Sequence, residues 1–75
     1  MASDIKDFFL DSFDDNILAL ENTMGFERNY ALYLESKGRK EEANKHWQEY
    51  YKAKKELTNY KRKVHRERRL HNKDD

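Results

Sequence analysis

The 75-residue sequence contains no cysteine and no proline, and only two glycines. Without cysteine the chain can form neither a disulfide nor a cysteine-ligated zinc site, and it has no thiol nucleophile. Because proline and glycine are the residues that interrupt helices, their scarcity favours long and regular helical segments. We therefore predict an all-α fold.

Long apolar runs are lacking as well. Only 36% of the residues are hydrophobic, and the longest apolar runs, Phe8–Leu10 and Ile17–Leu20, are much shorter than the roughly 20 residues that span a bilayer. The opening residues show no basic and apolar signal-peptide pattern, and alanine at position 2 excludes N-terminal myristoylation. We expect a cytoplasmic protein that does not associate with membranes.

What the chain does have is charge and aromatic rings. Charged residues make up 41% of it, a content that suits disorder. One Trp, five Tyr and four Phe nevertheless provide enough apolar area for a small core. We predict one helical domain over residues 1–75, near the lower size limit for a stable core. A core this thin favours self-association, such as a dimer that buries the aromatic faces in a bundle.

Hydrophobic spacing predicts three helical segments, at about residues 3–13, 16–37 and 39–70, followed by a disordered tail at 71–75. Gly38 would supply the left-handed residue that ends the second helix, so that the second and third helices form an antiparallel hairpin. At 1.5 Å per residue the third helix would be about 45 Å long and the second about 30 Å. The third helix should therefore extend beyond its partner.

The first two segments each have an apolar face. Ser3 is the expected N-cap of the first segment, and Asp14–Asn16 offers a cap for the second. Gly25 weakens the second helix by roughly 1 kcal/mol relative to alanine, so the backbone can bend or break there. The apolar faces consist of Ile5, Phe8, Phe9 and Phe13 in the first segment, and of Ile17, Leu20, Met24, Ala31 and Leu34 in the second.

The third segment has a less regular apolar stripe. Trp47 and Tyr50 are expected to pack in the core against the second helix, whereas Tyr51 and Tyr33 should point outward. The stripe follows a four-three spacing that also passes through two lysines: Ala43, Trp47, Tyr50, Lys54, Leu57, Lys61 and Val64. We expect the lysine stems to cover apolar neighbours while their ammonium groups reach water.

The predicted turn has a familiar sequence. The run Gly38–Ala43, followed by Trp47 and Tyr50–Tyr51, resembles the helical hairpin of a tetratricopeptide repeat. The resemblance covers one repeat, whereas a solenoid needs at least three. We therefore interpret it as the general chemistry of a helical hairpin.

Charge is divided between the two halves of the chain. Residues 1–36 carry eight acidic and two basic residues, a net charge of −6, whereas residues 37–75 carry fourteen basic and seven acidic ones, a net charge of +7. In a hairpin turning at Gly38, residue 17 lies near residue 59, which leaves the last turns of the third helix to the first segment.

This topology predicts internal pairing of opposite charges. The acids Asp4, Asp7 and Asp11 should lie near the bases of the third segment, which are Lys61, Arg62, Lys63, Arg66, Arg68 and Arg69. On the same face, apolar contacts should form between Ile5, Phe8 and Phe9 of the first segment and Tyr60, Val64 and Leu70 of the third.

An alternative leaves the basic end of the chain free. From Lys61 to Lys73 the sequence has seven Lys or Arg, two His and one Glu. A basic helix of this kind binds phosphates with an affinity that falls steeply with salt. Tyr51 and Tyr60 could then stack on unpaired bases.

No arrangement of residues predicts catalysis or metal binding. Glu42 and His46 are one helical turn apart, as are Glu67 and His71, but two ligands do not make a metal site, and we interpret both as surface pairs. The sequence has no nucleophile turn, glycine-rich phosphate loop or calcium loop. We predict a protein that is not an enzyme and that needs no cofactor or metal.

The predicted function is that of a small regulatory or adaptor protein that docks a helical face on a protein partner. Its size, charge and lack of reactive sites are similar to those of small accessory or inhibitor proteins of phages. The alternative is a DNA- or RNA-binding module that uses the basic C-terminal helix. The predicted contact residues are exposed aromatics and bases of the third segment: Tyr51, Lys55, Arg62, Arg66 and Arg69.

Overall fold

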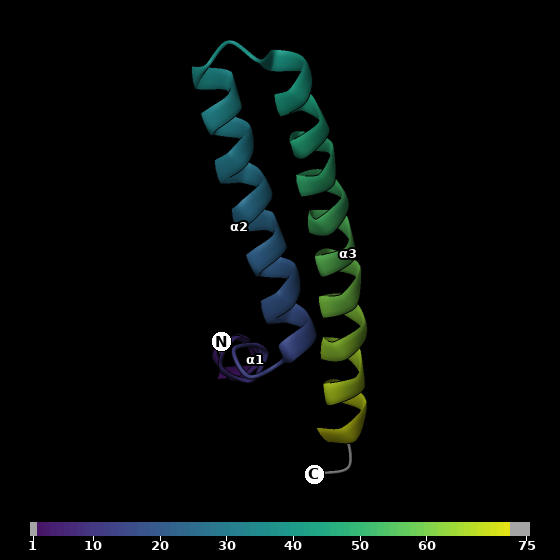
Figure 1. The fold of residues 1–75 in the computed structure, drawn as a ribbon. Helices are drawn as coiled ribbons and strands as arrows, with labels where there is room; N and C mark the ends of the chain where they lie inside the picture. The colour runs from purple at the N-terminus through teal and green to yellow at the C-terminus, as the bar shows by residue number, and fades with distance from the viewer. Residues whose placement is uncertain (1, 73–75) are drawn as a thin grey trace.

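A computed structural model of the chain describes residues 2–72, and the side chains of residues 5–70, as three helices (Figure 1). The helices are α1, Ala2–Asp11, α2, Asp15–Ser36, and α3, Lys40–Asn72. No strand occurs between residues 2 and 72, which confirms the all-α class. The two long helices run antiparallel, and α1 crosses the end of the hairpin that lies away from its turn. The molecule is elongated, at 56 × 21 × 17 Å.

The turn of the hairpin is built around Gly38, as predicted. Gly38 has a φ of 76°, in the left-handed region that glycine adopts without steric cost. Its N–H donates to the Glu35 carbonyl over 3.0 Å, and the Arg39 N–H donates to the Leu34 carbonyl over 2.9 Å. These bonds satisfy the last carbonyls of α2, so the chain can reverse directly after Ser36.

At its other end, α2 begins with a capped first turn. The Asp14 carboxylate accepts hydrogen bonds from the Asn16 and Ile17 N–H groups, over 2.9 and 3.2 Å. The expected cap is thus Asp14 itself. From there α2 continues without a break to Ser36, so no interruption occurs at Gly25. Packing against α3 along the whole helix offsets the weak helix preference of one glycine.

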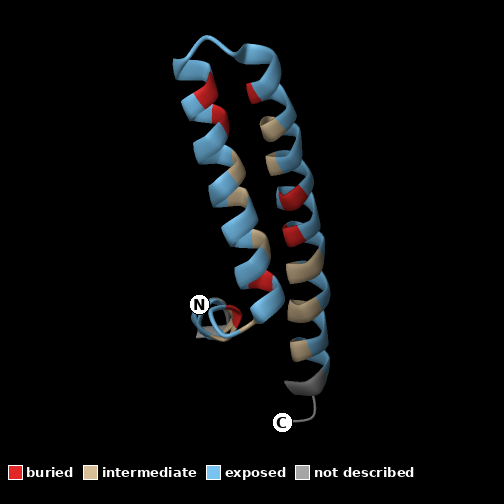
Figure 2. Ribbon diagram, in the orientation of Figure 1, coloured by how far each residue is buried: buried red, intermediate tan, exposed pale blue. Residues whose placement is uncertain are grey.

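The core is a narrow stripe between α2 and α3 (Figure 2). Ala31, Leu34 and Ala43 form its central cluster, and half-buried Trp47 packs against them. Alanines at this interface let the two backbones approach closely. The buried hydrophobic residues, at most 8% exposed, are Ile17, Ala31, Leu34, Ala43, Ala53 and Leu57.

The predicted stripe of α3 is wrong at one position. Ala53 is buried where the four-three spacing passes through Lys54, and Lys54 is exposed. Lys61 is half-buried, as expected of a lysine on the stripe, and Tyr60 beside it is half-buried too. The reason is that burying a methyl group costs far less than desolvating an ammonium.

The predicted apolar contacts of α1 are also wrong. Ile5 and Phe8 are 71% and 80% exposed, and Leu70 on α3, one of their expected partners, is 60% exposed. The helix turns its acidic side to α3 instead, because Asp7 and Asp11 find charged partners there.

Some predicted helix ends differ from the structure. α1 already includes Ala2, so Ser3 lies inside the helix and not at its cap, and α1 ends at Asp11. α3 continues to Asn72, two residues beyond its predicted end. The remainder of the predicted tail, residues 73–75, lies outside the described residues. Among the helices of residues 2–72, none combines the length and the apolar character that crossing a bilayer requires.

Candidate functional site

The five predicted contact residues lie together on one side of α3. Their spacings of four, seven, four and three residues place them on one helical face, opposite the buried stripe. All five are exposed, and Tyr51 exposes 60% of its surface. We call this surface the outward face of α3; it consists of Tyr51, Lys55, Arg62, Arg66 and Arg69.

The basic side chains of the outward face point to solvent. Within residues 5–70, none of its four bases forms an ion pair, whereas Arg68 does. Of the acids predicted to neutralise this end, Asp7 and Asp11 pair with Arg68 and not with Arg62, Arg66 or Arg69, and the Asp4 side chain lies outside the described residues. A positive surface remains along the last turns of α3.

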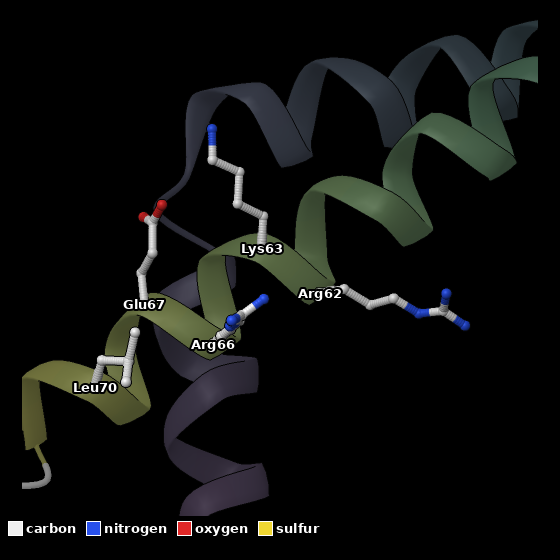
Figure 3. A pocket seen from close by; sticks show the side chains of 5 residues that line it. All are labelled: Arg62, Lys63, Arg66, Glu67 and Leu70. Atoms are coloured by element: carbon white, nitrogen blue, oxygen red, sulfur yellow. The ribbon is translucent and has the colours of Figure 1, made fainter.

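A shallow depression lies on this part of α3 (Figure 3). Arg62, Lys63 and Arg66 supply positive charge at its rim, and Glu67 supplies a carboxylate. Leu70, which is 60% exposed, adds an apolar contact. The depression therefore combines both signs of charge with an apolar side chain.

The Tyr51 ring contacts two other aromatic rings of α3. Its ring stacks on Trp47 with centroids 6.2 Å apart, and Tyr50 meets both rings edge-on. Trp47 is fixed in turn by its Nε1–H, which donates to Glu35 over 3.0 Å. Trp47 and Tyr50 are half-buried and Tyr51 points outward, which confirms the predicted arrangement. The result is a pre-positioned aromatic contact at the start of the outward face.

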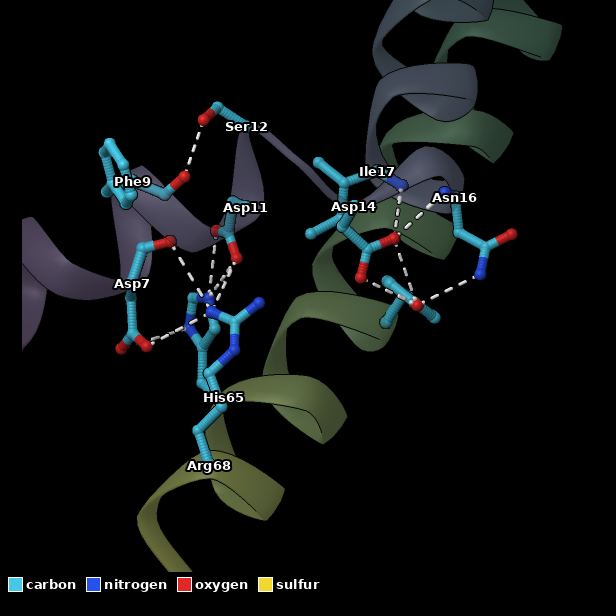
Figure 4. Close-up of polar contacts among 10 residues, drawn as sticks. Asp7, Phe9, Asp11, Ser12, Asp14, Asn16, Ile17, His65 and Arg68 are labelled. Atoms are coloured by element: carbon cyan, nitrogen blue, oxygen red, sulfur yellow. Dashed lines mark hydrogen bonds and ion pairs between the residues drawn. The ribbon is translucent and has the colours of Figure 1, made fainter. Parts of the chain in front are cut away.

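A second polar centre joins α1 to α3 (Figure 4). Arg68 Nη1 donates to Asp11 Oδ1 over 2.9 Å and to Asp7 Oδ1 over 3.2 Å. His65 Nε2 lies 3.0 Å from Asp11 Oδ2. Asp7, Asp11, His65 and Arg68 are hereafter called the ionic cluster, and they confirm the predicted meeting of the acidic first helix with the basic last one.

The ionic cluster changes the acidity of its members. Burial alone would raise the pKa of Asp11, which is only 9% exposed, but hydrogen bonds and positive charge from His65 and Arg68 outweigh burial and lower it. Burial opposes the charge of Arg68, yet the hydrogen bonds that its guanidinium donates to Asp11 and Asp7 raise the pKa of Arg68. Both shifts favour the charged forms of Asp11 and Arg68.

A smaller polar junction lies beside the ionic cluster. The Tyr60 hydroxyl donates to the Asp14 carboxylate over 3.0 Å and accepts from Asn16 Nδ2 over 3.0 Å. Tyr60 thereby binds the residue that caps α2 and fixes the register of the hairpin at its open end. The ring of Tyr60 is half-buried, and that it stacks on an unpaired base stays an untested alternative.

Two histidines form contacts that the sequence analysis missed. His46 pairs with Glu27 of α2 and lies 4.4 Å from the Tyr30 ring, while Glu42 pairs with Arg39. The predicted Glu42–His46 pair is thus wrong. A signal was present, because Glu27 falls on the stripe spacing of α2. The other predicted pair involves the His71 side chain, which lies outside the described residues.

The missed role of His65 had a comparable signal. His65 is three residues before Arg68, so both side chains lie on one face of α3 and reach the same helix. Among the described residues, no group of three or more potential ligands could hold a metal ion. That the chain uses no cofactor and catalyses no reaction stays a prediction.

The site therefore consists of an exposed basic and aromatic surface and a half-buried ionic bridge on another side of α3. Charge, hydrogen-bond donors and one aromatic ring are the means of recognition that it offers to a macromolecule. Comparisons of the chain with protein-family models, with curated proteins and with solved structures found no match.

Proposed function

We propose that the protein is a non-enzymatic regulatory or adaptor protein, and that it docks the outward face of α3 on an acidic surface of a protein partner. The observation that carries the proposal is the alignment, on one helical face, of Tyr51 with four bases that form no ion pair within residues 5–70. Interfaces favour aromatic residues, which bury large areas with few rotamers to lose, and arginine, whose planar guanidinium offers several hydrogen-bond donors.

The mixed character of the depression favours a protein partner over a nucleic acid. Glu67 lies among Arg62 and Arg66, where it would repel a phosphate but could accept hydrogen bonds from a partner protein. Exposed Leu70 offers apolar area that a phosphate backbone would not use. Tyr60 is half-buried, so its ring offers a base less surface than exposed Tyr51 does.

Nucleic-acid binding is the second candidate, and one observation supports it. Arg62, Arg66 and Arg69 lie along a single face, and none of them pairs with an acid within residues 5–70. Such a row of guanidinium groups can follow a phosphate backbone.

Photo-crosslinking separates the two candidates. Benzoylphenylalanine would replace Tyr51 on the outward face or, as a control, Phe26, an aromatic residue on α2 that is 61% exposed. In cells of the organism that encodes the protein, we expect a crosslink to one protein from position 51 and none from position 26. The crosslink should resist nuclease treatment.

Charge reversal tests the role of the arginines. The variant Arg62→Glu/Arg66→Glu/Arg69→Glu should lower the yield of the crosslink by roughly tenfold or more. Its matched control, Arg28→Glu/Lys40→Glu/Lys45→Glu, changes net charge equally on exposed residues elsewhere and should leave the yield unchanged. Binding of the purified protein to a generic DNA duplex is the contrary outcome. If this binding occurs at low salt, disappears at moderate salt, and is abolished by the first variant but not by the control, the nucleic-acid candidate replaces the proposal.

We also propose that the protein self-associates. Among the side chains of residues 5–70, six hydrophobic ones are buried, few for an independent domain. Many large apolar side chains remain exposed. A second copy of the chain could cover them.

A further inference from the structure

We infer that two copies of the chain associate through the apolar face of α1. This surface consists of Ile5, Phe8 and Phe9 on the helix and Phe13 just beyond its end. Their exposed fractions are 71%, 80%, 60% and 69%, which makes them the most exposed cluster of large apolar side chains among the described residues. The inference deepens the self-association proposed above by naming the surface.

The chain's own helices leave this surface uncovered. The ionic cluster holds Asp7 and Asp11 against α3, and Phe9 points away from the hairpin (Figure 4). Phe8 lines a depression with Leu18 of α2 and Lys61 of α3, yet most of its surface stays exposed. Phe9 and Phe13 already contact each other, with an edge-to-face geometry and centroids 5.1 Å apart. The surface is thus presented in a fixed orientation and needs little reorganisation to bind.

A second copy is the occupant that the chemistry of this surface favours. Among the described side chains of α1, the acids Asp7 and Asp11 contact α3, and exposed Lys6 lies at the edge of the apolar face beside Phe9 and Phe13. A patch that is apolar apart from this edge can be self-complementary, as a two-fold interface requires. Asp14 and Asp15 directly follow Phe13, and these carboxylates would repel the phosphates of an anionic membrane or a nucleic acid.

The area available also suits a small dimer. With roughly 150–250 Å² for each aromatic side chain, the exposed parts of these four residues amount to about 500 Å² per copy. Two copies would bury about 1,000 Å², which is the lower bound for a specific interface. The area of about 500 Å² per copy lies within the range of about 300–600 Å² that the largest apolar patch of an ordinary monomer covers.

Sedimentation velocity over a concentration series tests the inference. We expect the full chain to double in mass with increasing concentration, and Phe8→Ser/Phe9→Ser to weaken the dimer by roughly tenfold or more. The matched control is Phe26→Ser/Leu32→Ser, which removes exposed apolar side chains from α2 and should dimerise as the unmodified chain does. Circular dichroism would verify that each variant keeps its helix content.

A distance measurement identifies the surface independently of these variants. Because the chain has no native cysteine, Ser12→Cys carries a single spin label beside the apolar face of α1. Pulsed dipolar spectroscopy should show a short distance between the labels of two copies. The inference is overturned if the chain stays monomeric at all concentrations, or if it dimerises without this short distance. A monomer that binds phosphatidylcholine vesicles through Phe8 and Phe9 also overturns it. The variant with three reversed arginines should still dimerise, so failure of the docking proposal would leave this inference standing.

Discussion

The hairpin and the first helix of this protein are held in place by different forces. Between α2 and α3, contact is made by side chains such as Leu34 and Ala43, at 1% and 0% exposure. Between α1 and α3, the contacts that the structure describes are mainly ionic, and the large apolar side chains of α1 are exposed. One small chain thus contains a unit stabilised by the hydrophobic effect and a unit attached by charge.

The difference predicts different responses to the surroundings. Burial of apolar area is insensitive to salt and pH, whereas an ion pair at a partly exposed site weakens when either partner loses its charge or when salt screens it. Changes inside the hairpin should therefore unfold the whole molecule. Changes in the ionic cluster should release α1 and leave the hairpin folded.

The largest effect is expected from Leu34→Ala. Leu34 is 1% exposed and belongs to the central cluster, so its truncation should lower the free energy of unfolding by about 2–4 kcal/mol. A chain of this size rarely has more than about 3–5 kcal/mol from its core, so much of the population should unfold. Urea titration followed by circular dichroism measures the change. Leu32→Ala, at a residue 43% exposed, should cost only about 0.5 kcal/mol.

An intermediate effect is expected from Arg68→Ala. Removing this guanidinium leaves Asp7 and Asp11 without their closest donor, which should weaken the attachment of α1 by about 1–2 kcal/mol. Hydrogen exchange of the α1 amides should become roughly tenfold faster, while exchange at the centre of α2 stays unchanged. Arg69→Ala, which removes an exposed neighbour, is the matched control. Equal acceleration in both helices would show that the two units unfold together.

The smallest effect is expected from acidification. Because the pKa of Asp11 is lowered in the folded chain, this residue stabilises the attachment of α1 fully above its ordinary pKa of 3.8. The contribution decreases as the pH falls through the lowered value, since the unfolded form then binds the proton more readily. Exchange of the α1 amides, corrected for the intrinsic pH dependence, should increase below pH 3.8. In Asp11→Asn this dependence should be reduced.

The sequence was sufficient to predict the hairpin because local signals agreed there. Asp14 as a cap, Gly38 as the residue of positive φ, and the apolar spacing of α2 each specify the same boundary or face. The outward position of Tyr51 followed from the same periodicity. Local chemistry and helical geometry thus fixed two of the three helices.

The packing of α1 could not be predicted in the same way. Its acidic and apolar faces compete for α3, and sequence spacing alone does not show which one wins. In the structure Asp7 and Asp11 make the contact with α3, because their partners His65 and Arg68 lie on the part of α3 that extends beyond α2. Similarly, the choice of Ala53 over Lys54 depends on how closely α2 approaches, which is a property of the pair of helices and not of either alone.

The short turn at Gly38 has a consequence for the order in which the chain acquires its structure. It brings Leu34 and Ala43, which are close in sequence, directly together, whereas the contacts of α1 join residues 54 to 61 positions apart. Closing a long loop costs more entropy than closing a short one. We expect the two long helices to pack first next to the turn and then along their length, and α1 to attach last. Pulse-labelled hydrogen exchange during refolding would record this order.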